Sequence, residues 1–269
     1  MTLRILDEDG TLHFSHLKKL ALSGVQYLHA VNTPFEPTSE MKIGSVVHLL
    51  TLGASPGAKR LVRFDGMRRE GPEWEAFEAK NADAEILTFK EWEEAEHIAE
   101  AVVQSPRWAR MKGARFEVPL KWEENGIPCS TDGVDIIPIG DDLGDLKTAR
   151  CTNPEAFKRQ CFNMHYAQQL AFYRRGARAN GINVRDLFIF GVENRAPYED
   201  VELVLTPALI EFADKSVSLW FEDFRRNMLA CPEPKHVKDW PGYTEAPQVV
   251  WDVPPWMAKS ADELDAEAA

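Results

Sequence analysis

Hydrophobic and polar residues alternate strictly over residues 115–122, in the middle of the chain. A period of two predicts a half-buried strand, with Glu117 and Lys121 on one face and the apolar residues on the other. The apolar set consists of Phe116, Val118, Leu120 and Trp122. Residues 124–126 (Glu-Asn-Gly) are typical of a hairpin turn, so we expect the next strand to begin near Ile127.

Apolar residues spaced three and four apart predict helices elsewhere. The expected helices cover residues 14–30, capped by Ser15; 41–50, ending near Gly53; 88–104, opened by the capping box of Thr88 and Glu91; 153–176; and 206–228. In the last helix we expect these residues to face inward: Leu209, Phe212, Val217, Trp220, Phe224 and Met228. Apolar, β-rich runs at 184–193 and 200–205 predict two further strands.

Two segments lack such periodicity. Residues 53–83 are polar with scattered glycines, and we expect an exposed loop or insertion there. Residues 257–269 are acidic, lack aromatic residues and are expected to be a disordered tail. We expect residues 1–256 to form a single domain, which the chain length of 269 residues permits.

The composition is that of a globular protein, with 44% hydrophobic residues and a formal net charge of −12. Such acidity argues against a protein that coats nucleic acid nonspecifically. The chain has neither a long apolar run nor an apolar N-terminus, so we expect a cytoplasmic protein without membrane contact. Four scattered cysteines favour buried free thiols over an iron–sulfur cluster: Cys129, Cys151, Cys161 and Cys231.

Two basic groups could line a local channel for nucleic acid, although such runs are more often solvated surface. The first consists of Lys59, Arg60, Arg63 and Arg68, and the second of Arg150, Lys158, Arg159, Arg174, Arg175 and Arg178.

The acids best placed for chemistry lie in two short apolar runs, around Asp135 and around Asp145. Because side chains alternate along a strand, Asp145 and Lys147 would share one face while Leu146 points the other way. Two residues along a strand span roughly 6.5–7 Å, so the acid could hold a cation within reach of the ammonium. Glu117, Asp135 and Asp145 are expected on consecutive strands of one antiparallel meander.

That arrangement suits phosphodiester hydrolysis, which needs an activated water and charge stabilisation at phosphorus. Asp135 and Asp145 could bind Mg²⁺, with the carbonyl of Leu146 as a third ligand. Lys147 could orient the water or stabilise the transition state, and Glu117 could complete the ligand set or hold a second metal. The chain has no Gly-rich phosphate loop, HExxH or GxSxG motif.

Two further features stay open on local sequence alone. His48 lies in an apolar helical run, where a histidine satisfied within the core is the more common case. Tyr166, Gln169 and Tyr173 fall on one face of a predicted helix, which fits an edge of the core and a binding strip equally well.

The order acid, ten residues on, acid-x-Lys resembles the PD-(D/E)xK nuclease superfamily. Val134-Asp135 stands for its Pro-Asp and Asp145-Leu146-Lys147 for its (D/E)xK. More closely, the chain is similar to the RecB-like branch and to the nuclease domain of phage and prophage exodeoxyribonuclease VIII, over residues 12–256. The segments that carry the similarity are 44–48, 117–119, 145–148, 166–173, 192–194, 197–198 and 240–243.

The resemblance implies an α/β (α+β) fold in which helices flank a central mixed β-sheet, and a Mg²⁺- or Mn²⁺-dependent DNA exonuclease. By motif position it assigns metal binding to His48, Glu117, Asp135 and Asp145, catalysis to Lys147, and DNA contact to Tyr166, Gln169 and Tyr173. Members digest one strand of duplex DNA from an end, usually 5′ to 3′. The exposed strand passes to a partner annealing protein. They tend to form toroidal oligomers, and the resemblance implies a phage or prophage protein in a bacterial host.

The chain departs from the pattern at Val134, where the family has proline. Asp132 lies three residues before Asp135 and would take its place if the strand were shifted; the apolar residues that follow favour Asp135. Two other functions stay open. One is an endonuclease or single-strand nuclease in repair or defence, and the other is a nuclease-like DNA-binding or scaffold module without activity.

Overall fold

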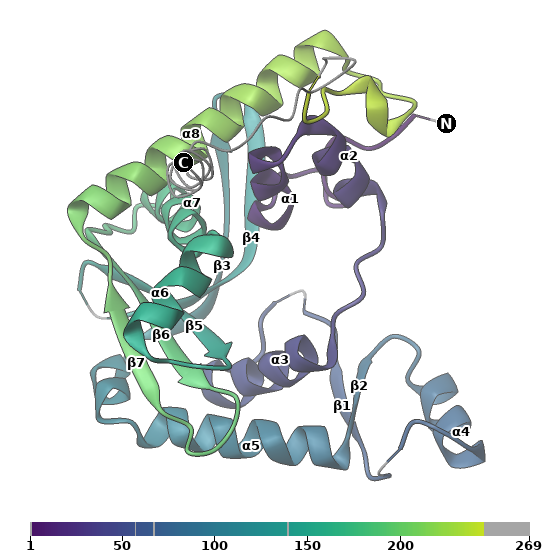
Figure 1. Cartoon of the computed structure of the whole chain (residues 1–269), viewed down its shortest axis with the longest axis vertical. Coiled ribbons are helices and arrows are strands. Elements are labelled where there is room, and N and C mark those ends of the chain that lie inside the picture. Colours follow the sequence, from purple (N-terminus) through teal and green to yellow (C-terminus); the bar gives the residue numbers. More distant parts are fainter. Residues whose placement is uncertain (1, 57, 67, 139, 245–269) are drawn as a thin grey trace, which may run out of the picture.

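A five-stranded mixed sheet forms the centre of the molecule (Figure 1). This computed structural model describes residues 2–56, 58–66, 68–138 and 140–244. The strands neighbour one another in chain order: β3 (Arg115–Glu124), β4 (Ile127–Ile137), β5 (Asp142–Ala149), β6 (Asp186–Glu193) and β7 (Asp200–Val204). The β5–β6 pair is parallel and the other three pairs are antiparallel. The expected mixed sheet and the β3–β4–β5 meander are therefore confirmed.

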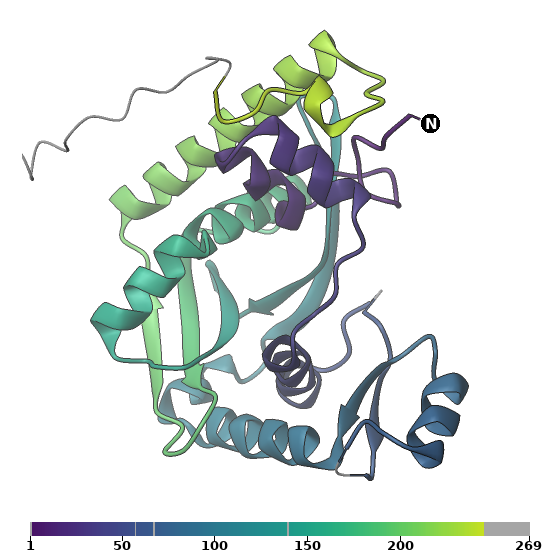
Figure 2. The same cartoon turned by 45° about the vertical axis from the view of Figure 1, so that its right-hand side comes forward.

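Helices cover both faces of this sheet (Figures 1 and 2). On one side lie α3 (Ser39–Leu52) and α5 (Phe89–Gln104), and on the other α6 (Pro154–Asn163), α7 (Tyr166–Ala179) and α8 (Pro207–Ala230). The N-terminal elements α1 (Phe14–Leu17), η1 (Lys18–Ala21) and α2 (Gly24–Asn32) pack beside α8. Two further 3₁₀ turns are η2 (Pro106–Met111) and η3 (Val237–Asp239).

The sheet separates two hydrophobic cores, because successive side chains of a strand point to opposite faces. Leu187 and Ile189 of β6 belong to the larger core, which also contains α7 and α8. Phe188 and Phe190 belong to the smaller core, beneath α3 and α5. The helices on each face are thus held by alternate residues of the same strand.

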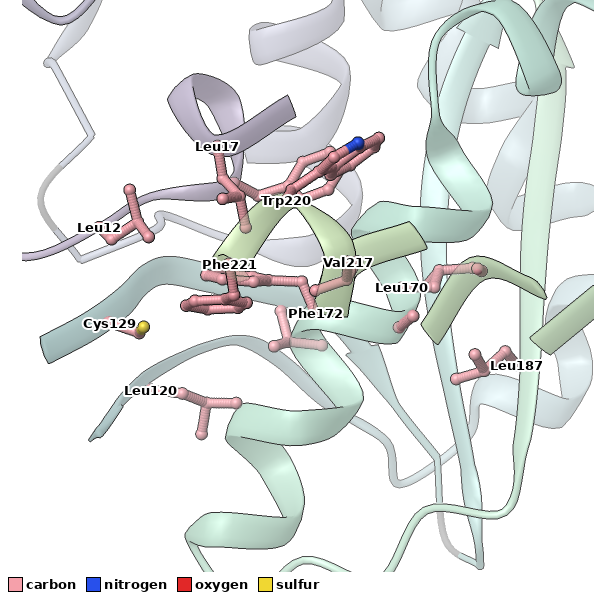
Figure 3. Packing of buried hydrophobic residues seen from close by; sticks show 14 of the residues in the cluster. Leu12, Leu17, Leu120, Cys129, Leu170, Phe172, Leu187, Val217, Trp220 and Phe221 are labelled. Carbon is pink, nitrogen blue, oxygen red and sulfur yellow. The ribbon is translucent and has the colours of Figure 1, made fainter. Parts of the chain in front are cut away.

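Aromatic packing fixes α7 against the sheet in the larger core (Figure 3). The ring of Phe172 lies 4.7 Å from Trp122 of β3 and 6.2 Å from Phe221 of α8, measured between centroids. Phe14 of α1 approaches the same ring at 5.8 Å. Such aromatic pairs each contribute about 0.5–1.5 kcal/mol beyond the area they bury. Their combined effect is a rigid α7, the helix that carries Gln169 and Tyr173.

The single helix expected over residues 14–30 is wrong, because the chain forms α1, η1 and α2 there. Ser23 interrupts it: its side chain accepts a hydrogen bond from the backbone N–H of Gln26 and caps α2. His13, not Ser15, occupies the N-cap of α1. The helix that follows, α3, was expected at 41–50 and begins two residues earlier at Ser39.

Residues 53–83 hold more regular structure than the expected loop. They contain β1 (Leu61–Phe64) and α4 (Pro72–Lys80), and β1 pairs in parallel with β2 (Glu85–Thr88). A small core of its own supports this unit, formed by Phe64, Trp74 and Ile86 with Val62 and Phe77 against them. The outer surfaces of such a small unit are polar, which explains the weak hydrophobic periodicity of its sequence.

The helix expected over 153–176 is two helices, α6 and α7. His165 lies between them in the left-handed conformation with φ 61°, which a right-handed helix cannot pass through. The expected capping box of Thr88 and Glu91 is confirmed at the start of α5. In α8, burial of Val217, Trp220 and Phe224 is confirmed.

Two expectations about which side chains face the core were wrong. In α8, Leu209 and Phe212 are 38% and 49% exposed, because Ile210 and Ala213 are the residues that turn inward. In β3, Phe116 packs in the smaller core, whereas Val118, Leu120 and Trp122 pack in the larger one. The strand changes face at Glu117, whose φ is +47°.

The C-terminal part of the described chain packs against the N-terminal region. Trp240 is buried and its ring stacks on Tyr27 of α2 at 5.3 Å. The last residues of the expected domain, 245–256, and the expected tail, 257–269, lie outside the described residues. Among the helices described, none combines the length and apolarity needed to cross a bilayer.

Candidate active site

Strand β5 brings Asp145 and Lys147 together on the face toward α7. Asp145 has no exposed surface, and Lys147 Nζ lies 2.7 Å from its Oδ2. Neither carboxylate oxygen of Asp145 has a hydrogen bond of good geometry. Leu146 points to the opposite face, into the smaller core. The alternation expected for these three residues is therefore present, and it leaves a buried carboxylate paired with the Lys147 ammonium.

A second group forms beside this pair from three separate elements. His48 of α3, Glu117 of β3 and Asp135 of β4 each offer a ligand atom, and these atoms lie within 4.8 Å of one another. His48 Nδ1 is 3.4 Å from Glu117 Oε1 and 3.7 Å from Asp135 Oδ2. Within the described part of the chain this is the one set of three or more His, Cys, Asp or Glu residues with such spacing.

The backbone of Leu146 links the two groups. Its N–H donates a hydrogen bond to Asp135 Oδ2 at 2.8 Å, and its carbonyl oxygen lies 3.0 Å from His48 Nε2. In the tautomer that carries the proton on Nε2, His48 donates to that carbonyl and leaves the Nδ1 lone pair facing the acids. A histidine that binds a metal typically donates its other ring N–H in this way.

An irregularity of β3 places Glu117. Its φ of +47° is unusual for a residue with a side chain and costs about 1–3 kcal/mol. The register with β4 shifts just after it, between Val118 and Leu120. Gly133 on β4 makes room for the carboxylate, since a Cβ atom there would overlap Glu117 Oε2. The irregular backbone of β3 thus directs the carboxylate of Glu117 toward His48 and Asp135.

Close packing of α3 on β5 places His48. Thr38 caps the helix, its side chain accepting from the backbone N–H of Met41. Gly44 lies one turn before His48, and a Cβ atom there would come within 3.3 Å of Thr148 Oγ1. The small residue lets the helix approach the strand, so that the imidazole of the next turn reaches the carbonyl of Leu146.

The pKa values of the site residues follow from the burial of several charged groups close together. Burial raises the pKa of Asp145 to about 7, even though Lys147 opposes the shift. Burial alone would lower the pKa of His48, but Asp135 and Glu117 outweigh it and the pKa is raised. Burial likewise opposes the charge on Lys147, and Asp145 and Asp135 overcome it and raise the pKa of that ammonium. Negative charge is in excess here, which favours a bound cation.

The donor set fits a hard divalent cation. Carboxylate and carbonyl oxygens predominate, as Mg²⁺ and Mn²⁺ prefer, and one imidazole nitrogen is added. Oδ1 of Asp145 supplies the structural test, because a buried carboxylate oxygen without a hydrogen-bond partner is costly unless a cation or water satisfies it. The cysteines do not belong to this donor set. All four are free thiols, and Cys129 lies in the larger core.

Helix α7 lines the approach to the site. Gln169 Nε2 donates to the hydroxyl of Tyr173 at 2.8 Å, and both residues border a cavity of about 360 Å³ that also reaches Glu117. Lys147 Nζ lies 5.0 Å from the centroid of the Tyr166 ring. All three residues of the strip expected from the sequence thus lie close to the acids or to the cavity beside them.

The two candidates for the first aspartate of the motif differ in burial and in the residues around them. Asp135 is 7% exposed and lies in the group with His48 and Glu117. Asp132 is exposed, borders the cavity and contributes its backbone carbonyl to a hydrogen bond from Ser55.

Two structural contributors had no individual signal in the sequence. Gly133 leaves space for Glu117, and Lys18 borders the cavity from the N-terminal region. Neither belongs to a motif that points to chemistry, because each meets residues distant in the chain.

The two basic groups do not form a channel of free cations. In the first, Arg60, Arg63 and Arg68 pair with Asp83, Asp65 and Glu70. In the second, Arg150 approaches Glu40, Lys158 pairs with Glu155, and Arg174 and Arg175 pair with Asp214. Most of this positive charge is therefore neutralised within the protein.

Comparison with known proteins agrees with the fold. A crystal structure described as a "Putative exonuclease" from Eubacterium rectale has a TM-score of 0.59 at 15% identity, covering 94% of this chain and 93% of that one. A structure of SSO0001 covers 72% of this chain and 92% of that one at 14% identity, with a TM-score of only 0.27. No curated protein matches.

A family model described as a PDDEXK-like domain of unknown function (DUF3799) matches residues 13–247. The match spans most of the chain, including all five strands of the central sheet and every residue of the site. The expected PD-(D/E)xK superfamily is thereby confirmed. The chain belongs to the PDDEXK-like DUF3799 family.

Proposed function

We propose that this protein is a divalent-metal-dependent DNA exonuclease that degrades one strand of linear duplex DNA. One observation carries the proposal. The buried carboxylate of Asp145, which is paired with the Lys147 ammonium at Oδ2 and has no hydrogen bond at Oδ1, lies beside a His–Glu–Asp group. This combination is expensive to bury in a protein with only a structural task, and it suits hydrolysis of a phosphodiester.

The cation would be held by one ring nitrogen of His48 and by the carboxylates of Glu117 and Asp135, with Asp145 as a further oxygen ligand. Where that nitrogen is Nε2, the Leu146 carbonyl 3.0 Å from it would join the oxygen ligands. When bound, it would neutralise charge at phosphorus and acidify a water molecule. Magnesium and manganese both suit these donors.

The chain's own residues would position the reactants. Asp145 holds Lys147 by a 2.7 Å ion pair, and Tyr166 lies under the ammonium. Lys147 Nζ can donate to the attacking water or to a phosphate oxygen, where it stabilises charge that develops in the transition state. The Leu146 N–H fixes the rotamer of Asp135. Gln169 and Tyr173 would contact the DNA strand in the adjoining cavity.

Finer points of the proposal rest on the family resemblance. They are 5′-to-3′ polarity, an annealing protein as partner in recombination, a ring-shaped homo-oligomer, and a phage or prophage origin in the bacterial cytoplasm. The net charge of −12 agrees with a substrate that is held locally at a metal site instead of over a broad basic surface.

The direct test is digestion of end-labelled linear duplex DNA with Mg²⁺ or Mn²⁺, for wild type, Lys147→Ala and Asp145→Ala. We expect wild type to release nucleotides from one strand, and each variant to lose activity by a factor on the order of 10² or more. Equal activity of all three proteins would refute the site assignment.

Covalently closed circular DNA is the control for the mode of attack. An exonuclease leaves it intact, whereas cleavage of the circle would identify an endonuclease. Preference for single-stranded over duplex DNA would identify a single-strand nuclease. Binding without cleavage under all these conditions would identify an inactive DNA-binding module.

A further inference from the structure

Lys18 is a cation without an acidic partner on the wall of the cavity beside the site. It is the first residue of η1 and the single lysine or arginine among the described residues that line this cavity. Its Nζ lies 5.9 Å from the centroid of the Phe14 ring. No ion pair or hydrogen bond of its ammonium occurs within the described ranges, whereas Arg174 and Arg175 of α7 are paired with acids.

The surroundings of Lys18 disfavour its charge. Burial, followed by the nearby ammonium groups of Lys19 and Lys147, lowers the pKa of Lys18. Lys18 lines the same cavity as Glu117 of the metal group. A cation kept in such a position without compensation destabilises the free protein, unless an anion joins it in the functional complex.

The cavity connects Lys18 to the metal group. Glu117 belongs to both, and Gln169 and Tyr173 of α7 form a wall between them. The remaining wall includes Ser55 and Asp132, neither of which pairs with Lys18. A ligand with an anionic group beside Lys18 can therefore extend through one cavity to the metal group.

We propose that Lys18 binds a phosphate group of the DNA strand, next to the phosphate that is hydrolysed at the metal group. The proposal rests on the proposed function for the identity of the ligand. The N-terminal element η1 would then contribute to substrate binding, and Lys18 would position the strand without touching the reacting atoms. Its charge, uncompensated in the free protein, is neutralised only in the complex.

The test measures the dissociation constant of fluorescent linear duplex DNA with Ca²⁺ in place of Mg²⁺, across a series of salt concentrations. Lys18→Gln should weaken binding about tenfold, and should reduce the slope of log K against log salt by about one. Lys18→Arg should keep most of the affinity. The matched control is Lys19→Gln, which removes the same charge from the next residue, outside the cavity; it should bind nearly as wild type does.

Duplexes with a 5′-hydroxyl and a 5′-phosphate distinguish the source of the phosphate. Equal weakening on both identifies a phosphate within the strand, and weakening on the phosphorylated duplex alone identifies the terminal one. Thermal unfolding of Lys18→Gln should occur at the same or a higher temperature than wild type, because an uncompensated charge is removed.

Wild-type affinity and salt slope in Lys18→Gln would overturn the proposal. Equal losses in Lys18→Gln and Lys19→Gln, or in Lys18→Gln and Lys18→Arg, would overturn it as well. Because the assay measures binding, a wild-type protein that binds DNA but cleaves none would refute the nuclease function and leave the result for Lys18 readable.

Discussion

Helix α7 contacts two charged clusters that are built in opposite ways. Near its C-terminal end, Arg175 donates to Asp214, Glu124 and Ser218 at 2.9, 3.0 and 2.6 Å. A further hydrogen bond runs from Arg175 Nη2 to the backbone carbonyl of Asp214 at 2.7 Å. Every nitrogen of the guanidinium therefore has an acceptor, although the side chain is only 15% exposed.

The cluster near the start of α7 leaves its charges incompletely satisfied. Asp145 is fully buried and pairs with Lys147 at Oδ2, but it has no hydrogen bond at Oδ1, and Glu117 is held in a strained conformation. The comparison indicates that a buried charge with a complete set of partners has a structural task. A buried charge that lacks them indicates a place reserved for a ligand.

Replacing an acid of the incomplete cluster should produce the largest effect. We expect Asp135→Ala to lose nuclease activity by a factor of about 10³, because a metal ligand and the partner of the Leu146 N–H both disappear. The measurement is the initial rate on linear duplex DNA. Asp132→Ala is the matched control and should stay within about threefold of wild type, which a surface change warrants. A greater loss in Asp132→Ala than in Asp135→Ala would reverse the assignment of the first aspartate.

A second change would disturb the same cluster without touching a ligand. In Gly133→Ala the new methyl group collides with Glu117, so the carboxylate must leave its place near His48. We expect metal affinity to fall roughly 10- to 100-fold, as for other residues that orient ligands. Calorimetric titration with Mn²⁺ measures it. Gly126→Ala is a control at another glycine, with positive φ but open space around it; unchanged metal binding there and also in Gly133→Ala would exclude the proposed role of Gly133.

The complete cluster should respond in stability and not in chemistry. The substitution Arg175→Met leaves Glu124 and Asp214 without their shared partner. It should lower the free energy of unfolding by about 2 kcal/mol. Urea denaturation measures this change. Arg226→Met is the control, since its ion pair with Asp223 is exposed on α8 and worth little. Loss of nuclease activity in Arg175→Met at temperatures where it stays folded would contradict the contrast between the clusters.

A last prediction needs no substitution and concerns the pH dependence of metal binding. In the metal-free protein, the pKa of Asp145 is raised to about 7 by burial, and that of His48 is raised by Asp135 and Glu117 against the effect of burial. Both groups hold protons at pH 6 that a cation must displace, so affinity should increase as pH rises. For each proton displaced, the gain is about tenfold per pH unit below the pKa and vanishes above it. Mn²⁺ titrations at pH 6, 7 and 8 measure it, and a constant affinity would show that neither proton is displaced.

The sequence by itself determined the elements that carry the central acids. Strict alternation in β3, the Asn-Gly turn and the apolar runs of β4 and β5 predict three adjacent strands, since a period of two matches the alternation of side chains along an extended chain. The spacing of Asp145 and Lys147 also determined that their side chains share a face. These features depend on neighbours in the chain, so that local sequence is sufficient.

Only the tertiary structure decided which distant residues meet. His48 comes within 3.4 Å of Glu117 across 69 positions, because Gly44 lets α3 approach β5 and the backbone of β3 turns at Glu117. The helix break at His165 could not be predicted from the sequence either, since no glycine or proline marks that left-handed residue. The sequence contains the charged residues without showing which of them find partners. That difference depends on packing over the whole fold, and it is what separates the Arg175 cluster from the candidate active site.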